Sequence, residues 1–139
     1  MPRQRVSSPE VAEAAPGLWS NALRVGDVLY LSGTTARGRD GQTVEGEGEY
    51  EQTRTIFTKM RHLIEAAGGT MNDMVKMTIF VTDISRNTEV WRARREFFTG
   101  DFPTSTLVEI SRLAKPEIKV EIEAIAHIGC SRASPAGER

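Results

Sequence analysis

Two glutamates and a histidine alternate with apolar residues near the end of the chain. From Val120 to Ala126 every second residue is apolar, whereas Glu121, Glu123 and His127 fall on the opposite face. A period of two residues predicts a strand that is buried on one side. A carboxylate on the polar face acts as a general base on water when burial raises its pKa, and otherwise it is solvated. The sequence leaves both interpretations of Glu121 open.

Few other residues are candidates for nucleophilic catalysis or metal binding. The chain has a single cysteine, Cys130, and two histidines, His62 and His127. Neither histidine lies in the sequence context of a cysteine protease, and the spacing of the three residues does not match a zinc or iron site. We therefore expect no metal site in this protein.

The composition favours one domain that does not bind nucleic acid. A chain of 139 residues has about the length of one domain. It carries 18 Lys and Arg against 19 Asp and Glu, a net charge of -1, so no excess of positive charge is available for a phosphate backbone. Arg92, Arg94 and Arg95 are interleaved with Glu89 and Glu96, which is typical of a solvated helix face.

The sequence also argues against a membrane partner. No apolar run approaches the roughly 18 residues that cross a bilayer, and the first residues lack the apolar core of a secretory signal. We therefore expect a cytoplasmic protein. Because the two ends are polar or rich in Pro, Ala and Glu, we expect flexible segments at 1–15 and 129–139 around a single domain at 16–128.

Hydrophobic periodicity predicts an α+β fold. Residues 19–23 and 28–31 are expected to form a hairpin around Gly26, followed by an exposed glycine-rich loop at 37–48. Two amphipathic helices are expected, at 50–67 and 88–98, and three further strands, at 75–82, 103–110 and 119–128. This order suits a mixed sheet with both helices layered on one face. Since the other face would be bare, we expect an oligomer with small-molecule clefts between subunits.

Several short motifs together resemble the Rid (YjgF) family of reactive-intermediate deaminases. Their shared order and spacing carry the resemblance, which runs from about residue 16 to 128. The motifs are Asp27–Gly33, Gln52–Arg54, Ala66–Gly68, Asp73–Lys76, Phe80–Asp83, Glu96–Phe98, Phe102–Pro103 and Val120–Ala126.

The resemblance implies a fold, an assembly and a chemistry. It implies a chorismate-mutase-like (YjgF-like) two-layer subunit and a homotrimer around a central barrel, with three clefts at the subunit interfaces. It implies hydrolysis of enamines or imines such as 2-aminoacrylate to 2-oxo acids and ammonia, with no cofactor. In the cleft, Glu121 matches the glutamate that positions the attacking water, and Ser32 and Gly33 match strand-end positions that line the cleft.

This sequence departs from the deaminating members at the anchor for the substrate carboxylate. Those members have an arginine where this chain has Ser105, between Thr104 and Thr106. A serine hydroxyl donates one neutral hydrogen bond, whereas a guanidinium offers a bidentate, charge-assisted pair. We therefore expect weak affinity for a small amino-acid-derived anion. Arg94 and Arg112 are candidates to restore the missing charge from other positions.

Two tryptophans change the shape of the expected cleft. Trp19 aligns with the family's cleft tyrosine and Trp91 with its cleft asparagine. Both changes add flat apolar surface, so a larger or aromatic ligand, which need not be charged, fits better than 2-aminoacrylate. At either position the tryptophan could instead belong to the core of a subunit interface.

Two classes of function remain open from the sequence. The first is a cofactor-free hydrolase that acts on an enamine, an imine or a related unsaturated C–N compound other than 2-aminoacrylate. The second is a binding or regulatory homotrimer that keeps the clefts but not the chemistry. An endoribonuclease or translation inhibitor, a description often attached to the family, is disfavoured by the acidic charge balance.

Overall fold

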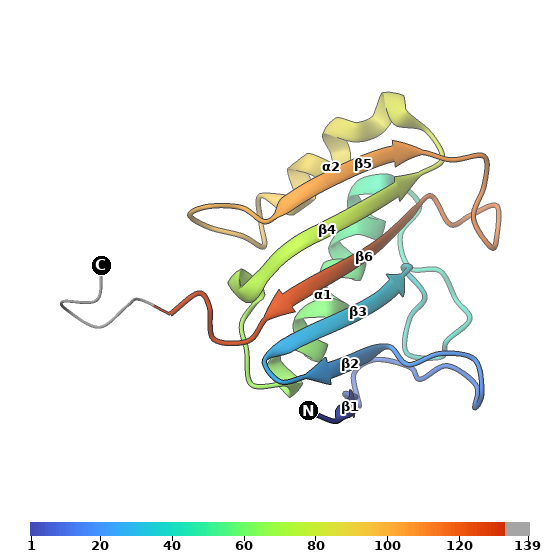
Figure 1. The fold of residues 1–139 in the computed structure, drawn as a ribbon. Coiled ribbons are helices and arrows are strands. Elements are labelled where there is room, and N and C mark those ends of the chain that lie inside the picture. The colour runs from blue at the N-terminus through green and yellow to red at the C-terminus, as the bar shows by residue number, and fades with distance from the viewer. Residues whose placement is uncertain (133–139) are drawn as a thin grey trace.

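A six-stranded sheet and two helices make up residues 1–132, the part of the chain that this computed structural model describes (Figure 1). The strands are β1 (Arg3–Val6), β2 (Ala22–Val25), β3 (Val28–Thr34), β4 (Met74–Val81), β5 (Thr104–Glu109) and β6 (Val120–His127). The helices are α1 (Glu49–Ala66) and α2 (Asn87–Arg94), and short 3₁₀ turns lie at Met71–Asp73 and Ile84–Arg86.

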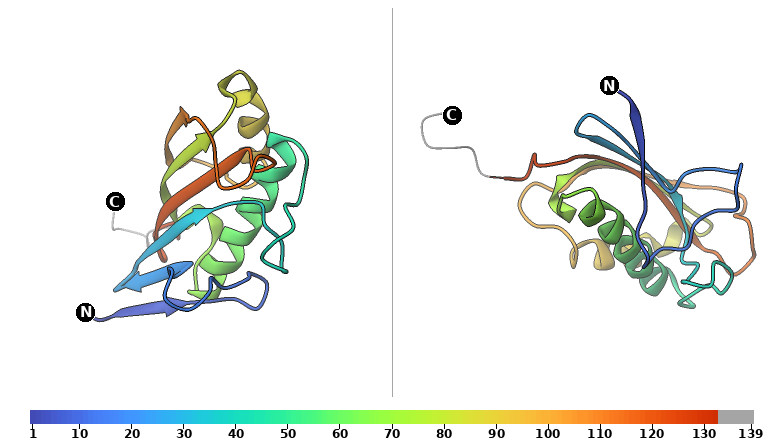
Figure 2. Two further views of the ribbon diagram at one scale, coloured as in Figure 1. Left: turned by 90° about the vertical axis from the view of Figure 1, so that its right-hand side faces the viewer. Right: turned by 90° about the horizontal axis from the view of Figure 1, so that it is seen from below.

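The sheet is mixed and is covered by helices on one face only. Its strand order is β1-β2-β3-β6-β4-β5, and every neighbouring pair is antiparallel except β4 and β5. Helix α2 lies in the crossover between these two parallel strands, which a hairpin cannot join. Both helices pack against the same face of the sheet (Figure 2). The predicted α+β, two-layer architecture is therefore confirmed.

The core lies between the sheet and α1. The apolar stripe that predicted this helix is buried, including Ile56, Met60 and Leu63. Phe57 extends the core toward α2, because its ring centroid lies 5.4 Å from those of both Phe97 and Phe98. The other face of the sheet remains open and partly apolar, since Tyr30 is 48% exposed and Val108 is 38% exposed.

The hairpin is present, but its strands lie later in the chain than predicted. Strand β2 begins at Ala22 rather than at residue 19, and β3 continues to Thr34 rather than ending at residue 31. The two-residue turn at Gly26–Asp27 needs a positive φ, and Gly26 supplies one of 60°. Trp19 and Ser20 precede the hairpin and belong to the loop before it.

The segment expected to be flexible at the N-terminus contains a strand. Residues Arg3–Val6 pair with β2 as an antiparallel edge strand. Only Val6 in this strand is buried, so no alternation of apolar residues marks it in the sequence.

The tail expected at 129–139 lies largely outside the described residues. Helix α2 ends at Arg94, four residues before the predicted end, and the amides of Glu96 and Phe97 bond three residues back, to the carbonyls of Ala93 and Arg94.

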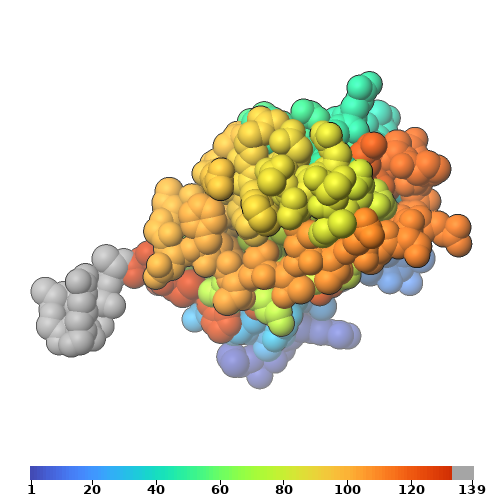
Figure 3. Space-filling model, turned by 90° about the horizontal axis from the view of Figure 1, so that it is seen from above, coloured from blue at the N-terminus to red at the C-terminus, as the bar shows by residue number. Residues whose placement is uncertain are grey.

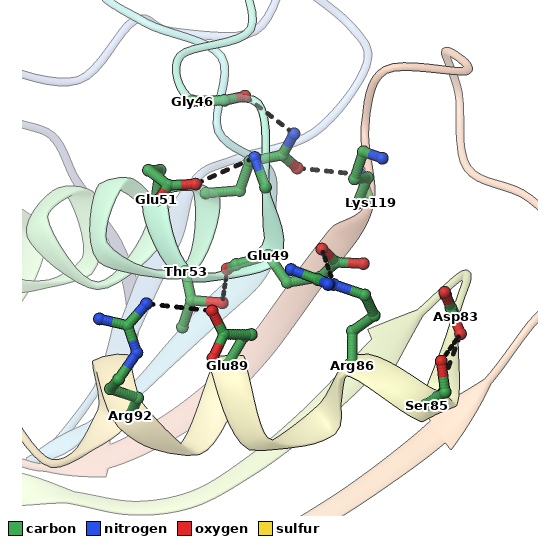
Figure 4. A network of polar contacts seen from close by, with 12 residues as sticks. Gly46, Glu49, Glu51, Thr53, Asp83, Ser85, Arg86, Glu89, Arg92 and Lys119 are labelled. Carbon is green, nitrogen blue, oxygen red and sulfur yellow. Dashed lines mark hydrogen bonds and ion pairs between the residues drawn. The ribbon is translucent and has the colours of Figure 1, made fainter.

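A buried glutamine ties α1 to the loop before β6. The Gln52 side chain is fully buried and makes three hydrogen bonds to backbone groups. It donates to the carbonyls of Gly46 and Glu117, and it accepts from the amide of Lys119 at 2.9 Å. Figure 4 shows the bonds to Gly46 and Lys119 beside the ion pair of Arg86 with the buried Glu49. The loop that leads into β6 is therefore fixed to α1.

A buried aspartate holds the start of β4 against the end of β6. Asp73 is 1% exposed and accepts hydrogen bonds from the amides of Thr70, Gly129 and Ser131. Burial by itself raises the pKa of the Asp73 carboxyl, but these hydrogen bonds outweigh burial and the pKa lies below its usual value. The ionised carboxylate has only acceptor sites and can accept all three hydrogen bonds, whereas the protonated acid would place an O–H donor among the backbone N–H donors.

We predict that Asp73→Asn lowers the free energy of unfolding by about 1–3 kcal/mol at neutral pH, because the new amide group faces backbone donors. The folded pKa is depressed, so the carboxylate stabilises the fold above the ordinary value of 3.8 and loses this contribution as the pH falls further. Urea unfolding of both proteins across this range measures the difference. Asp101→Asn, at an exposed aspartate, is the control, and an equal loss there would contradict the prediction.

Candidate functional site

Glu121 lies on the open face of the sheet, directly opposite Phe80 of the neighbouring strand β4. Its strand neighbours Val120 and Ile122 are fully buried on the helix side. Glu121 itself is half-buried. Burial raises the pKa of the Glu121 carboxyl and the negative charge of Glu123 raises it further, while Arg37 opposes both. Such a carboxylate is a better base toward water than a solvated one.

A β-bulge in β3 places bare backbone against this carboxylate. Leu31 pairs with Ala124 and Thr34 with Ile122, so Ser32 and Gly33 together oppose one residue of β6. A Cβ atom at Gly33 would overlap the carboxylate of Glu121 and would lie 3.1 Å from its Cδ. A side chain at this position would displace the Glu121 carboxylate from the strand.

The residues before the hairpin cover the same end of the sheet. The Ser32 hydroxyl donates to the carbonyl of Ser20 at 2.5 Å, which holds this loop beside β3. Trp19, which is 50% exposed, and Gly33 line a cavity of about 450 Å³ between the loop, the segment after β3 and α1. Gly33 thus lies against Glu121 and shares a cavity with Trp19, whereas Glu121 and Ser32 do not line that cavity.

Two cations in this cavity were not singled out from the sequence. Arg37 and Lys59 line the cavity together with Trp19 and Gly33. Lys59 lies three residues after Ile56 and four before Leu63, on the edge of the apolar stripe of α1. A charged residue at such a helical position was the available signal.

Ser105 lies on the opposite side of the sheet from Glu121. It is level with Met77 of β4, whose side chain is buried in the core, so Ser105 points toward the helices. There its hydroxyl oxygen accepts a hydrogen bond of 2.8 Å from Nη1 of Arg94 in α2. Thr104 and Thr106 point toward the open face, and the Thr104 hydroxyl donates to the carbonyl of Val75.

A guanidinium therefore stands beside the serine that replaces the expected arginine. Arg94 is half-buried and makes no ion pair within residues 1–132. Burial lowers the pKa of Arg94, and the adjacent Arg95 lowers it further.

Aromatic side chains flank this arginine. Trp91, Arg94, Arg95 and Phe102 line a second cavity of about 290 Å³. Trp91 is 38% exposed and Phe102 is 42% exposed. Figure 3 shows this side of the molecule, where α2 and β5 lie next to each other at the surface.

The candidate residues form two groups that do not meet within one chain. Glu121 with Gly33 and Trp19 belongs to the β3 and β6 part, and Ser105 with Arg94 and Trp91 belongs to the α2 and β5 edge. Arg112 lies in the exposed loop after β5 and makes no side-chain contact with a described acceptor.

Residues 1–132 contain no cluster of three or more His, Cys, Asp or Glu side chains that could hold a metal ion. None of their helices has both the length and the apolar character that crossing a membrane requires.

Comparison with known proteins gives matches over most of the chain. The family model described as Endoribonuclease L-PSP matches residues 10–128. The RutC family protein PH0854 of Pyrococcus horikoshii is 32% identical over 112 residues, which are 80% of this chain and 87% of the relative.

Solved structures agree with the sequence matches. RidA from the Antarctic bacterium Psychrobacter sp. PAMC 21119 is 30% identical with a TM-score of 0.81, covering 90% of this chain and 99% of that one. The Rid family protein YyfA from Yersinia pestis, whose structure is described as that of a protein of unknown function, is 30% identical with a TM-score of 0.83. That likeness covers 91% of this chain and 100% of YyfA. The sequence motifs, the fold and these matches agree, and the chain belongs to the Rid (YjgF) family.

Proposed function

We propose that this protein is a cofactor-free hydrolase that acts on the C–N bond of an imine, an enamine or a related unsaturated metabolite other than 2-aminoacrylate. The observation that supports the proposal best is the half-buried carboxylate of Glu121, held against the backbone of Gly33 with a raised pKa. A water bonded to this carboxylate gives it a proton while the water oxygen bonds to the imine carbon. The imine nitrogen then receives this proton from Glu121 and the remaining hydroxyl proton, the C–N bond breaks as the C=O bond forms, and ammonia and a carbonyl compound are released.

We propose that the active assembly is a homotrimer. The open face of the sheet, with exposed Tyr30 and Val108, is the surface that subunits would cover. Because Glu121 and Ser105 point to opposite faces of one sheet, a cleft that uses both needs two subunits. The β3 and β6 region of one subunit would then face the α2 and β5 edge of its neighbour.

The surroundings of Ser105 support a substrate that is larger and flatter than 2-aminoacrylate. In this chain the cationic group is Arg94, which comes from α2 rather than from β5 and stands next to Trp91. A guanidinium set back from the strand leaves room for a longer ligand, and the aromatic faces of Trp91 and Phe102 suit a flat one. Thr104 and Thr106 on the open face are further candidates for ligand contacts.

A binding protein without catalysis is the alternative. It is favoured by the positions of Glu121 and Ser105 on opposite faces of the sheet, because one chain cannot direct both side chains at the same ligand. Ribonuclease activity has less support, because the net charge of -1 provides no basic surface for a phosphate backbone.

We predict that Glu121→Gln lowers the rate of imine hydrolysis by about 100-fold or more, the usual contribution of a general base. Imines are generated in situ from alanine and from phenylalanine by an amino-acid oxidase, and release of the 2-oxo acid above the spontaneous rate is measured. In the wild type the rate should fall on the acid side at a pH above the ordinary glutamate value of 4.5, since only the deprotonated carboxylate accepts a proton. Glu117→Gln, at an exposed glutamate in the loop before β6, is the control.

The outcomes separate the two functions. Faster hydrolysis of the phenylalanine-derived imine than of the alanine-derived one supports the proposed substrate class. Equal rates for wild type and Glu121→Gln, with trimers intact by light scattering, would contradict the proposed catalysis and favour the binding protein.

We predict that Ser105→Arg alone raises kcat/KM for the small alanine-derived imine only slightly, because the new guanidinium would be repelled by that of Arg94 beside it. The double change Ser105→Arg with Arg94→Met removes this repulsion, and we expect about a tenfold rise in kcat/KM, the effect of one charge-assisted hydrogen bond. Steady-state kinetics of the single and double variants on both imines measures the effect. An equal gain in both variants would show that Arg94 does not control the anion site.

A further inference from the structure

The lysine in the middle of α1 has an unusual hydrogen-bonding environment. Nζ of Lys59 donates to the carbonyl of Thr35 at 2.7 Å and to the carbonyl of Arg37 at 2.9 Å. No carboxylate bonds to this amine within residues 1–132. The side chain is half-buried between α1 and the segment that follows β3.

These two bonds match the needs of a neutral amine. An ammonium has three N–H donors, whereas a neutral amine has two donors and one lone pair. At Lys59 two acceptors are present, so the neutral form leaves no donor unsatisfied and has its lone pair free. Burial lowers the pKa of Lys59 to about 8, the charge of Arg37 adds to this effect, and Glu45 opposes it. The environment therefore provides the form of lysine that acts as a nucleophile.

Two cavities give access to this amine. Lys59 and Arg37 line the cavity of about 450 Å³ described above and also an adjoining one of about 400 Å³. This adjoining cavity lies between α1, the N-terminal segment at Glu10 and the loop at Glu45. Either volume exceeds that of a small organic acid several-fold on the scale of ligand pockets.

Arg37 supplies an anion-binding group beside the amine. Its guanidinium makes no hydrogen bond or ion pair with residues 1–132, and its Nε is buried without an acceptor. Other cations on the cavity wall already have partners, since Arg39 pairs with Glu10 and Arg54 with Glu96. A guanidinium without an acceptor, beside an amine without a carboxylate partner, fits a ligand that has a carboxylate and an electrophilic carbon close together.

We propose that Lys59 condenses with small 2-oxo acids, with Arg37 binding their carboxylate, in a reaction that uses neither Glu121 nor Ser105. The Nζ lone pair forms a bond to the ketone carbon. Both Nζ protons leave with the ketone oxygen as one molecule of water, and a C=N bond replaces the C=O bond. This site takes the same compound class that the proposed hydrolase releases, but it does not depend on the hydrolase activity.

The test is covalent trapping. The full chain is incubated with pyruvate and cyanoborohydride at pH 8, which reduces any imine to a stable secondary amine, and the modified residues are mapped by peptide mass spectrometry. Lys76, Lys115 and Lys119 are internal controls, and the α-amine of Met1 is followed as a separate peptide. About half of the Lys59 amine is neutral at this pH, against less than about 1% for an ordinary lysine, so we expect at least about tenfold more adduct at Lys59.

Variants test whether Lys59 is reactive rather than structural, and whether its reaction is independent of the proposed hydrolase. Lys59→Gln should abolish the selective adduct, and Arg37→Met should reduce it about tenfold for pyruvate but not for acetone, which has no carboxylate. Arg3→Met, at an exposed arginine outside both cavities, is the charge-matched control. Glu121→Gln should leave the adduct unchanged. Labelling of Lys59 no faster than that of the other three lysines, or an equal effect of Arg37→Met on both ketones, would overturn the proposal.

Discussion

Side chains on consecutive residues of a strand point to opposite faces of the sheet, and this pleat decides which candidate residues can share a site. In β6 it buries Val120 and Ile122 under the helices and turns Glu121 to the open face. In β5 the register with β4 turns Ser105 the other way, toward α2. One chain therefore presents Glu121 on one face and Ser105 with Arg94 on the other, so the cleft that we propose needs residues of two subunits.

The missing cationic anchor has a second consequence. A guanidinium on β5 would have been held by the strand, whereas Arg94 extends from a helix and reaches the serine by a single hydrogen bond. Its position between Trp91 and Phe102 joins charge and aromatic surface in one cavity. Ser105, Arg94 and the two aromatic side chains form the anion site that we propose, and its shape suits the larger, flatter substrate proposed above.

Lys59 shows how burial changes what a common residue can do. On an exposed helix face its amine would be protonated and inert toward carbonyl compounds. Here the amine donates to two backbone carbonyls, and burial and the neighbouring Arg37 lower its pKa, so that much more of it is in the neutral form. The same carbonyls belong to the segment after β3, so the loop that leads from the Gly33 bulge toward α1 is held by the residue that we propose to be reactive.

The order of elements and the open face followed from the sequence, because hydrophobic periodicity reflects burial directly. The family also followed from it, because short motifs such as Asp27–Gly33 and Val120–Ala126 keep their spacing. The sequence placed Glu121 on a polar face but left its burial open. Tertiary structure alone decided the pairing of β1, the bulge at Gly33, the contact of Arg94 with Ser105 and the position of Lys59 beside Arg37. These features depend on contacts between residues far apart in the chain or on the pairing register, and local periodicity contains no information about either.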